Sequence, residues 1–138
     1  MSSQKYLLDT NICAFYLRGK YHIDEYIDNV GWDNCYISEI TMLELKFGAE
    51  LSRQRDGIDR STELNRFLEA IKILPIIDAI DIAAKEKIRL RLAGTPAADN
   101  FDLLIACSAI AYGCIMVTDN TKDFINFTGI KLINWIKR

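Results

Sequence analysis

The chain has 138 residues, of which 50% are apolar and 26% are charged, and its formal net charge is −2. A chain of this length folds as one domain with a substantial core, and its charge excludes a polycation that coats nucleic acid by charge alone. No apolar run reaches the roughly 20 residues of a membrane span. Asp9 comes too early for the apolar region of a signal peptide, so we expect a cytoplasmic protein.

Short apolar runs alternate with helical patterns along the chain. In chain order, these patterns predict strand 6–8, helices 10–17 and 23–30, strand 35–37, helices 39–51 and 61–72, strand 73–77, helices 78–93 and 100–113, strand 114–118, a helical turn at 122–125 and strand 131–135. Ser38, Ser61 and Asp99 are the predicted N-caps of three helices. The alternation predicts one α/β domain over residues 1–138, whose mainly parallel central sheet is flanked by helices.

The chain has four cysteines and one histidine. The cysteines are widely spaced in apolar surroundings, which indicates buried reduced thiols and no metal or disulfide framework: Cys13, Cys35, Cys107 and Cys114. His22 lies in a polar stretch and is expected at the surface. Because a single histidine excludes zinc sites built from several, acid–base or metal chemistry must use carboxylates.

Polar residues follow two strands that we expect at the centre of the sheet. The segment Asp9-Thr10-Asn11 follows the first strand, and Thr118-Asp119-Asn120 closes the fourth. In open parallel sheets, ligands bind beyond the carboxyl ends of the strands. Helix capping or turn formation explains either segment alone, but the two together indicate a site.

Helical phase adds two more carboxylates. Helix 39–51 carries an apolar stripe that we expect to be buried, formed by Ile40, Leu43, Phe47 and Leu51. Glu44 lies at the margin of this stripe. Asp102 heads a stripe of small and apolar residues that should pack on the sheet. An acidic residue is favourable near any helix N-terminus, but that benefit does not require Asp102 to lie on the side of the helix that faces the sheet.

Asp9, Glu44, Asp102 and Asp119 can thus converge at one edge of the sheet. Such a cluster is costly, because burial and like charges raise the pKa of each carboxyl group. The usual compensation is a hard divalent cation with oxygen ligands, Mg²⁺ or Mn²⁺. The pattern therefore predicts a metal site for phosphodiester hydrolysis or phosphoryl transfer.

These segments, in this order, resemble the motifs of the PIN-domain nucleases and, more narrowly, those of the VapC toxins of bacterial toxin–antitoxin pairs. The resemblance covers nearly the whole chain and rests on residues 8–12, 37–50, 101–106 and 117–135. It implies a Rossmann-like three-layer PIN domain. The N-terminal segment with Cys13 and the Val-Thr-x-Asn-Thr pattern are most similar to the subgroup that cleaves transfer RNA.

The resemblance also implies residue roles. Asp9 and Asp102 match the family's metal carboxylates, and Glu44 matches its helix acid. Asp119 stands at the fourth position, which is Asn in part of the subgroup. Asp99 and Asp123 are close enough in sequence to replace it.

Three further polar residues, Asn11, Thr118 and Asn120, would support the carboxylates or the phosphate by hydrogen bonds. The implied activity is that of a Mg²⁺- or Mn²⁺-dependent endoribonuclease, the toxin of a type II toxin–antitoxin pair. Its implied partners are RNA, with transfer RNA the subgroup's substrate, a cognate antitoxin and a second copy in a homodimer. Basic residues at 53–66 and 85–91 would contact the RNA backbone.

Two alternatives belong to other functional classes. Asp9-Thr10-Asn11 after a strand is weakly similar to the nucleophile loop of haloacid-dehalogenase-like phosphatases, but that loop needs a second Asp where this chain has Asn11. The other alternative is a non-catalytic α/β binding module whose acidic residues only cap helices. Covalent aspartyl-phosphate would indicate the phosphatase, and a lack of stabilisation by Mg²⁺ or Mn²⁺ would indicate the binding module.

Overall fold

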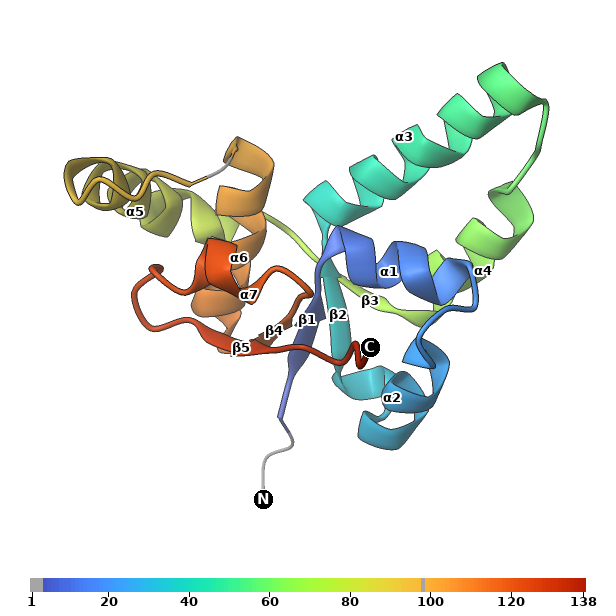
Figure 1. Cartoon of the computed structure of the whole chain (residues 1–138), viewed down its shortest axis with the longest axis horizontal. Helices are drawn as coiled ribbons and strands as arrows, with labels where there is room; N and C mark the ends of the chain where they lie inside the picture. Colours follow the sequence, from blue (N-terminus) through green and yellow to red (C-terminus); the bar gives the residue numbers. More distant parts are fainter. Residues whose placement is uncertain (1–3, 98) are drawn as a thin grey trace.

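The computed structural model describes residues 4–97 and 99–138, and its centre is a five-stranded sheet (Figure 1). The strands are β1 (Tyr6–Leu8), β2 (Cys35–Ser38), β3 (Lys72–Leu74), β4 (Ile115–Val117) and β5 (Lys131–Ile133). Their order across the sheet is β3-β2-β1-β4-β5, and every neighbouring pair is parallel. The predicted α/β fold is confirmed.

Helices cover both faces of this sheet. They are α1 (Thr10–Leu17), α2 (Ile23–Val30), α3 (Glu39–Asp56), α4 (Ser61–Ala70), α5 (Ile80–Leu92), α6 (Asn100–Tyr112) and α7 (Thr121–Phe124), with short 3-10 turns at Trp32–Asn34 and Ile77–Ala79. Helices α1 to α4 lie on one side of the molecule and α5 and α6 on the other (Figure 1). The result is the three-layer arrangement of helices, sheet and helices.

The alternation of side chains along β1 divides the core into two parts. Leu7 packs with residues of α5 and α6, whereas Leu8 packs with residues of α1, α2 and α4. Both leucines are fully buried, because successive side chains of a strand point to opposite faces and β1 is the central strand. Asp9 directly follows the last residue of β1 and therefore lies at the carboxyl edge of the sheet.

Side-chain caps begin the helices that carry the candidate site. Asp9, Ser38 and Asp99 each accept a hydrogen bond from a backbone N–H of the helix that follows, as predicted for Ser38 and Asp99. Ser61 is not a cap: it is the first residue of α4, and its backbone N–H donates to Asp59 Oδ1 at 2.9 Å. Gly113 ends α6 in the left-handed conformation, with a φ of 67°.

Several predicted boundaries were wrong. The helix from Glu39 continues to Asp56, five residues further than expected, because it meets no left-handed glycine before Gly57. The strand predicted at 73–77 is observed as β3 at Lys72–Leu74. It ends before Pro75, because proline has no N–H to donate to a neighbouring strand. The strands predicted at 114–118 and 131–135 are likewise shorter, and α4 ends at Ala70.

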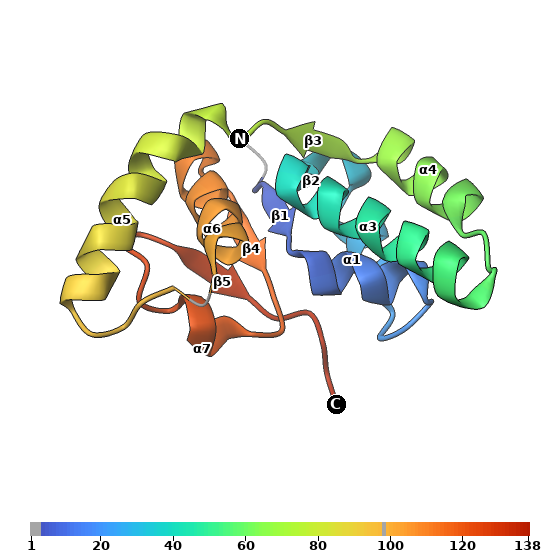
Figure 2. The same cartoon turned by 90° about the horizontal axis from the view of Figure 1, so that it is seen from above.

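The predicted burial of the α3 stripe was also wrong. Ile40 is buried, but Leu43, Phe47 and Leu51 are 53%, 65% and 37% exposed. Beyond its first turns, α3 projects away from the sheet, so no second layer covers this face (Figures 1 and 2). We refer to Leu43, Phe47 and Leu51 as the α3 stripe.

The cysteines and the histidine lie where the sequence predicted. All four cysteines are free and buried. His22 is at the surface, where it lies 3.7 Å from Glu25. Among the described helices, none is both long and apolar enough to cross a membrane.

Candidate active site

Three carboxylates reach the carboxyl edge of the sheet from three elements. The backbone N–H of Asp9 donates to Val117 O at 3.0 Å, and its Oδ1 accepts from Ile12 N at 3.1 Å. Glu44 lies in the second turn of α3, and Asp102 lies in the first turn of α6. Since α3 contacts both α1 and α6, the three side chains come from neighbouring elements.

Besides burial, the charge of Glu44 raises the pKa of both Asp9 and Asp102. Burial, and then the charges of Asp99, Glu44, Asp9 and Asp123, raises the pKa of Asp102 from 3.8 to about 6. Burial is also the main cause that raises the pKa of Asp9, which is 7% exposed, and the charge of Glu44 adds to it. Asp9, Glu44 and Asp102 therefore share one electrostatic environment, with Asp99 and Asp123 at its margin.

Thr118 holds Asp9 in place. Its Oγ1 is fully buried, donates to Asp9 Oδ2 at 2.6 Å and accepts from the backbone N–H of Asn120 at 3.1 Å. This hydrogen bond lowers the pKa of Asp9 and partly offsets the effect of burial. Thr118 thus lies where a supporting residue was expected.

Two further threonines lie near Glu44: Thr10 contacts it directly, and Thr41 contacts Thr10. The sequence did not single out either as a supporting residue. Thr10 Oγ1 donates to Glu44 Oε1 at 2.5 Å and lies 3.1 Å from Thr41 Oγ1. Thr10 directly follows Asp9, and Thr41 precedes Glu44 by one helical turn. The signal that could have revealed them is the presence of a hydroxyl residue beside each of two predicted site acids.

The structure does not bring Asp119 into this group. Arg138 donates to both of its carboxylate oxygens, at 2.9 and 2.7 Å, and Asn134 Nδ2 donates at 3.0 Å. The Arg138 guanidinium is the main cause that holds the pKa of Asp119 below its usual value. The expected fourth carboxylate is therefore engaged by the C-terminal segment, a long-range contact that helical phase and strand position do not reveal.

The other expected site residues lie around the three carboxylates. Asp99 caps α6 through a hydrogen bond from Asp102 N to its Oδ1, at 2.7 Å. Asp123 lies in α7 and is exposed. The side chains of Asn11 and Asn120 are also exposed, and the described parts of the chain offer them no hydrogen-bond partner.

The donor set matches a hard divalent cation. All three groups are carboxylates, the ligands that Mg²⁺ and Mn²⁺ prefer, and within residues 4–97 and 99–138 no Lys, Arg or His forms an ion pair with any of them. No described side chain or backbone N–H donates to the carboxylate of Asp102. Over the same ranges, no three acidic, His or Cys side chains are close enough together to hold a metal ion, so the three carboxylates do not form a closed metal shell.

A groove of about 510 Å³ begins at this group and lies between α1, α3 and α4. Its lining combines small, apolar and charged residues: Thr10, Ala14, Leu17, Arg18, Glu44, Leu45, Gly48, Ala49, Ser52, Arg60, Glu63 and Leu64. We refer to it as the α1–α3–α4 groove. Because Glu44 and Thr10 line one part of it, a molecule bound there could reach the carboxylates.

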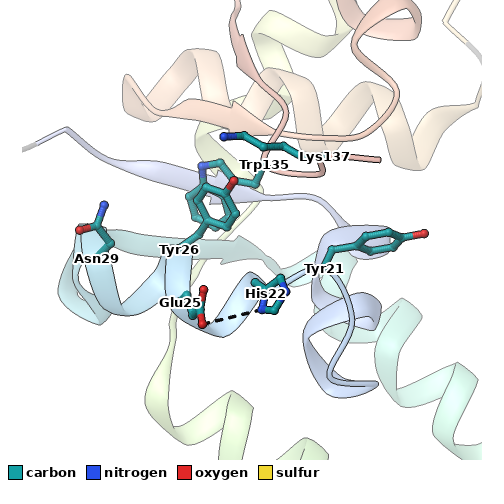
Figure 3. A pocket seen from close by; sticks show the side chains of 7 residues that line it. All are labelled: Tyr21, His22, Glu25, Tyr26, Asn29, Trp135 and Lys137. Carbon is teal, nitrogen blue, oxygen red and sulfur yellow. Dashed lines mark ion pairs between the residues drawn. The ribbon is translucent and has the colours of Figure 1, made fainter.

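A second pocket, of about 680 Å³, lies beneath the C-terminal segment (Figure 3). Figure 3 shows Tyr26 and Trp135 stacked in it and His22 directed toward Glu25. The ring centroids of Tyr26 and Trp135 are 5.3 Å apart. The Arg138 guanidinium lies 5.4 Å from the centre of the Tyr21 ring. The stacking of Trp135 and the contact of Arg138 with Tyr21 hold the C-terminal segment in place. This position allows Arg138 to bind Asp119.

Some members of the two basic clusters are engaged within the fold. Arg53 pairs with Glu50, and Arg89 pairs with Glu86 and also donates to Asn126 O at 2.6 Å. Lys87 Nζ donates to Asn100 Oδ1 at 2.9 Å, at the start of α6. Lys87 is therefore bound to the start of α6, the helix that carries Asp102, whereas Arg53 and Arg89 serve intramolecular pairs.

Comparison with known proteins gives a consistent result. The model of the PIN domain family matches residues 6–129. The chain is 33% identical over 133 residues to the "tRNA(fMet)-specific endonuclease VapC" of Shigella flexneri, covering 95% of this chain and 98% of that protein. It is 32% identical over 143 residues to "Ribonuclease VapC2" of Rickettsia felis, covering 96% and 98%.

Solved structures show the same relation. The fold is similar to a chain in the crystal structure of VapBC2 from Rickettsia felis bound to a DNA fragment from their promoter, with a TM-score of 0.85 and 27% identity, over 96% of this chain and 99% of that one. It is also similar to a chain of the DNA-bound VapBC from Salmonella typhimurium, with a TM-score of 0.82 and 30% identity, over 96% and 98%.

Proposed function

The chain belongs to the PIN domain family, in its VapC branch, and on that premise we propose that it is a divalent-metal-dependent endoribonuclease and the toxin of a toxin–antitoxin pair. The observation that carries the proposal is the position of Asp9, Glu44 and Asp102 at the carboxyl edge of a parallel sheet. Besides burial, the charge of Glu44 raises the pKa of both aspartates, and none of the three carboxylates has a basic partner among the described residues. Relatives named as ribonucleases support the substrate class.

We assign the metal ligands to Asp9, Glu44 and Asp102. When bound, Mg²⁺ or Mn²⁺ would polarise the scissile phosphate and favour ionisation of an attacking water. Thr118 keeps Asp9 oriented through its 2.6 Å hydrogen bond. Asp99 supports Asp102 by capping its helix, and the amides of Asn11 and Asn120 are available to the phosphate.

Lys87 and its neighbours on α5 are the proposed contacts for the RNA backbone. Lys87 lies next to the start of α6, the helix that carries Asp102. Lys85 and Arg91 are exposed on the same helix. Because phosphate contacts dominate nucleic-acid affinity, replacing these residues should weaken RNA binding with little effect on metal binding.

Transfer RNA is the proposed substrate, and this rests on the printed names of relatives from Shigella flexneri and Salmonella typhimurium. A cognate antitoxin is the proposed partner, because the similar structures are VapBC complexes. We place a segment of the antitoxin in the α1–α3–α4 groove, which leads to Glu44. A second copy of the chain would cover the α3 stripe, because three exposed apolar side chains along one helical face form an apolar patch on a free chain.

Incubation of purified protein with total RNA, with Mg²⁺ or Mn²⁺ and with excess EDTA, tests the proposed activity. Cleavage with metal and none with EDTA is expected, and sequencing of the new ends identifies the RNA. Fragments concentrated in one transfer RNA support the proposed substrate, whereas fragments spread evenly over messenger RNA contradict it. Aspartyl-phosphate formation would instead support the phosphatase alternative.

The proposed assembly is tested separately. Co-expression with the product of the neighbouring gene should yield a complex that does not cleave RNA, and Ala49→Arg should block its formation. Sedimentation of the free chain should show a dimer that Phe47→Glu converts to a monomer. A wild-type chain that sediments as a monomer would contradict the proposed homodimer.

A further inference from the structure

Thr10, Thr41 and Glu44 form a short hydroxyl–carboxylate chain beside the site. Thr10 Oγ1 lies 2.5 Å from Glu44 Oε1 and 3.1 Å from Thr41 Oγ1. Thr41 is fully buried. The three residues come from the first turn of α1 and the first two turns of α3.

The number of available protons determines how these groups are connected. An ionised carboxylate can only accept hydrogen bonds, and a threonine hydroxyl has a single proton to donate. If Thr10 donates its proton to Glu44, as the 2.5 Å distance indicates, then the proton between the two hydroxyls comes from Thr41. Thr41 thus orients Thr10, and Thr10 orients Glu44.

Glu44 needs such support more than its two neighbours. Asp9 has a shorter side chain and accepts from both Thr118 and Ile12 N. Asp102 is also short and lies in the first turn of α6. Glu44 has one more rotatable bond, and among the described residues Thr10 is its one hydrogen-bond donor.

We propose that Thr10 and Thr41 are positioning residues that hold the Glu44 carboxylate toward Asp9 and Asp102 for metal binding. The inference rests on the proposed function and extends it to two residues outside the carboxylate set. Its competitor is a structural role, in which the same hydrogen bonds only join α1 to α3. The two roles differ in what they change: positioning affects metal binding, whereas a structural tie affects only stability.

Thr10→Val removes the hydroxyl with little change in side-chain shape, and Thr10→Ser keeps it. We expect Thr10→Val to raise about tenfold the Mn²⁺ concentration needed to shift the midpoint of thermal unfolding by a fixed amount, and likewise the concentration for half-maximal RNA cleavage. Thr10→Ser should restore both values to within about twofold of wild type. Thr41→Val should have the same effect in a weaker form, because it acts through Thr10.

Thr62→Val is the matched control, since Thr62 is an exposed threonine in the first turn of α4, a helix that carries none of the three carboxylates. It should leave the Mn²⁺ dependence unchanged. If Thr10→Val fails to unfold cooperatively, Thr10→Ala replaces it. A Thr10→Val chain with lower thermal stability but wild-type Mn²⁺ dependence would show that the role is structural and overturn the inference.

The measurements also separate this inference from the proposed function. If wild type cleaves RNA and Asp9→Asn does not, while Thr10→Val has wild-type Mn²⁺ dependence, the function stands and the inference fails. If wild type cleaves no RNA but is stabilised by Mn²⁺, and Thr10→Val weakens that stabilisation, the function fails and the positioning role stands. A wild-type chain that Mn²⁺ does not stabilise overturns the inference.

Discussion

Asp102 and Glu86 are acidic residues on adjacent helices, yet their surroundings are opposite. Glu86, on α5, is 7% exposed and receives two hydrogen bonds from Arg89 (2.7 and 2.9 Å) and two from Thr128 (2.6 and 3.3 Å). These contacts, with Arg89 foremost, lower the pKa of Glu86 to about 2. Asp102 faces other carboxylates, and its pKa is raised to about 6.

This difference separates a structural acid from a functional one. Glu86 is compensated by its own chain, and through Thr128 it fixes the segment after α7 to α5. Asp102, Asp9 and Glu44 have no basic partner among the described residues, which costs stability and leaves negative charge for a ligand to neutralise. Asp119, paired with Arg138, belongs with Glu86 in this respect.

The largest expected effect is that of Asp9→Asn on RNA cleavage. Asn caps a helix about as well as Asp, so α1 should persist, and removal of one crowded charge should leave the metal-free chain as stable as wild type or slightly more so. Cleavage should fall by about 100- to 1000-fold, because the lost charge stabilisation is worth several kcal/mol at the transition state. Initial cleavage rates and thermal melts measure the two effects. A well-folded, active Asp9→Asn chain would contradict the proposed mechanism.

Glu86→Gln should show the opposite pattern. It removes the charged acceptor of Arg89 and Thr128, so the free energy of unfolding in urea should fall by about 2 kcal/mol. RNA cleavage by the folded protein should change little. Glu50→Gln, which affects an exposed pair with Arg53, is the control and should leave stability unchanged within error. If Glu86→Gln and Glu50→Gln lowered the free energy of unfolding equally, Glu86 would be no more important for stability than an exposed acid.

Stability should depend on pH in opposite directions at the two acids. Because the pKa of Asp102 is raised in the folded state, its contribution to stability is full below pH about 3.8 and is lost as pH rises through about 6. In EDTA, the free energy of unfolding of wild type relative to Asp102→Asn should therefore rise by about 1 kcal/mol from pH 7 to pH 4, after allowance for screening. Glu86 contributes stability above pH about 4.5, which is lost as pH falls toward about 2. Urea unfolding from about pH 2 to pH 7 measures both effects. If the free energies of unfolding of wild type and Asp102→Asn changed with pH in parallel, the prediction for Asp102 would be contradicted.

The smallest expected effect is that of Asp119→Asn. Asn keeps an oxygen for Arg138 but removes the charge, so thermal stability should fall slightly. Cleavage should stay within about twofold of wild type, the rate equivalent of about 0.5 kcal/mol, because the carboxylate faces the C-terminal segment. A loss as large as that of Asp9→Asn would return Asp119 to the metal ligands.

Local sequence patterns predicted the fold well and the element ends poorly. The α/β alternation, the exact spans of α1 and α2, and the Ser38 and Asp99 caps agree with the structure. Period and capping are properties of a few consecutive residues, so one sequence is enough to predict them. The end of α3 was missed, because no strong stop signal stands between Leu51 and Gly57.

By itself, the sequence indicated four acids that could meet: Asp9 and Asp119 from their places after strands, and Glu44 and Asp102 from their helical phase. Only the tertiary structure decided that Arg138 engages Asp119, that Thr10 joins Glu44 to Thr41, and that the α3 stripe is exposed. The physical reason is that strand and helix periods set the direction of a side chain relative to its own element. What that side chain meets there depends on segments distant in the chain, and their packing is not encoded in any local pattern.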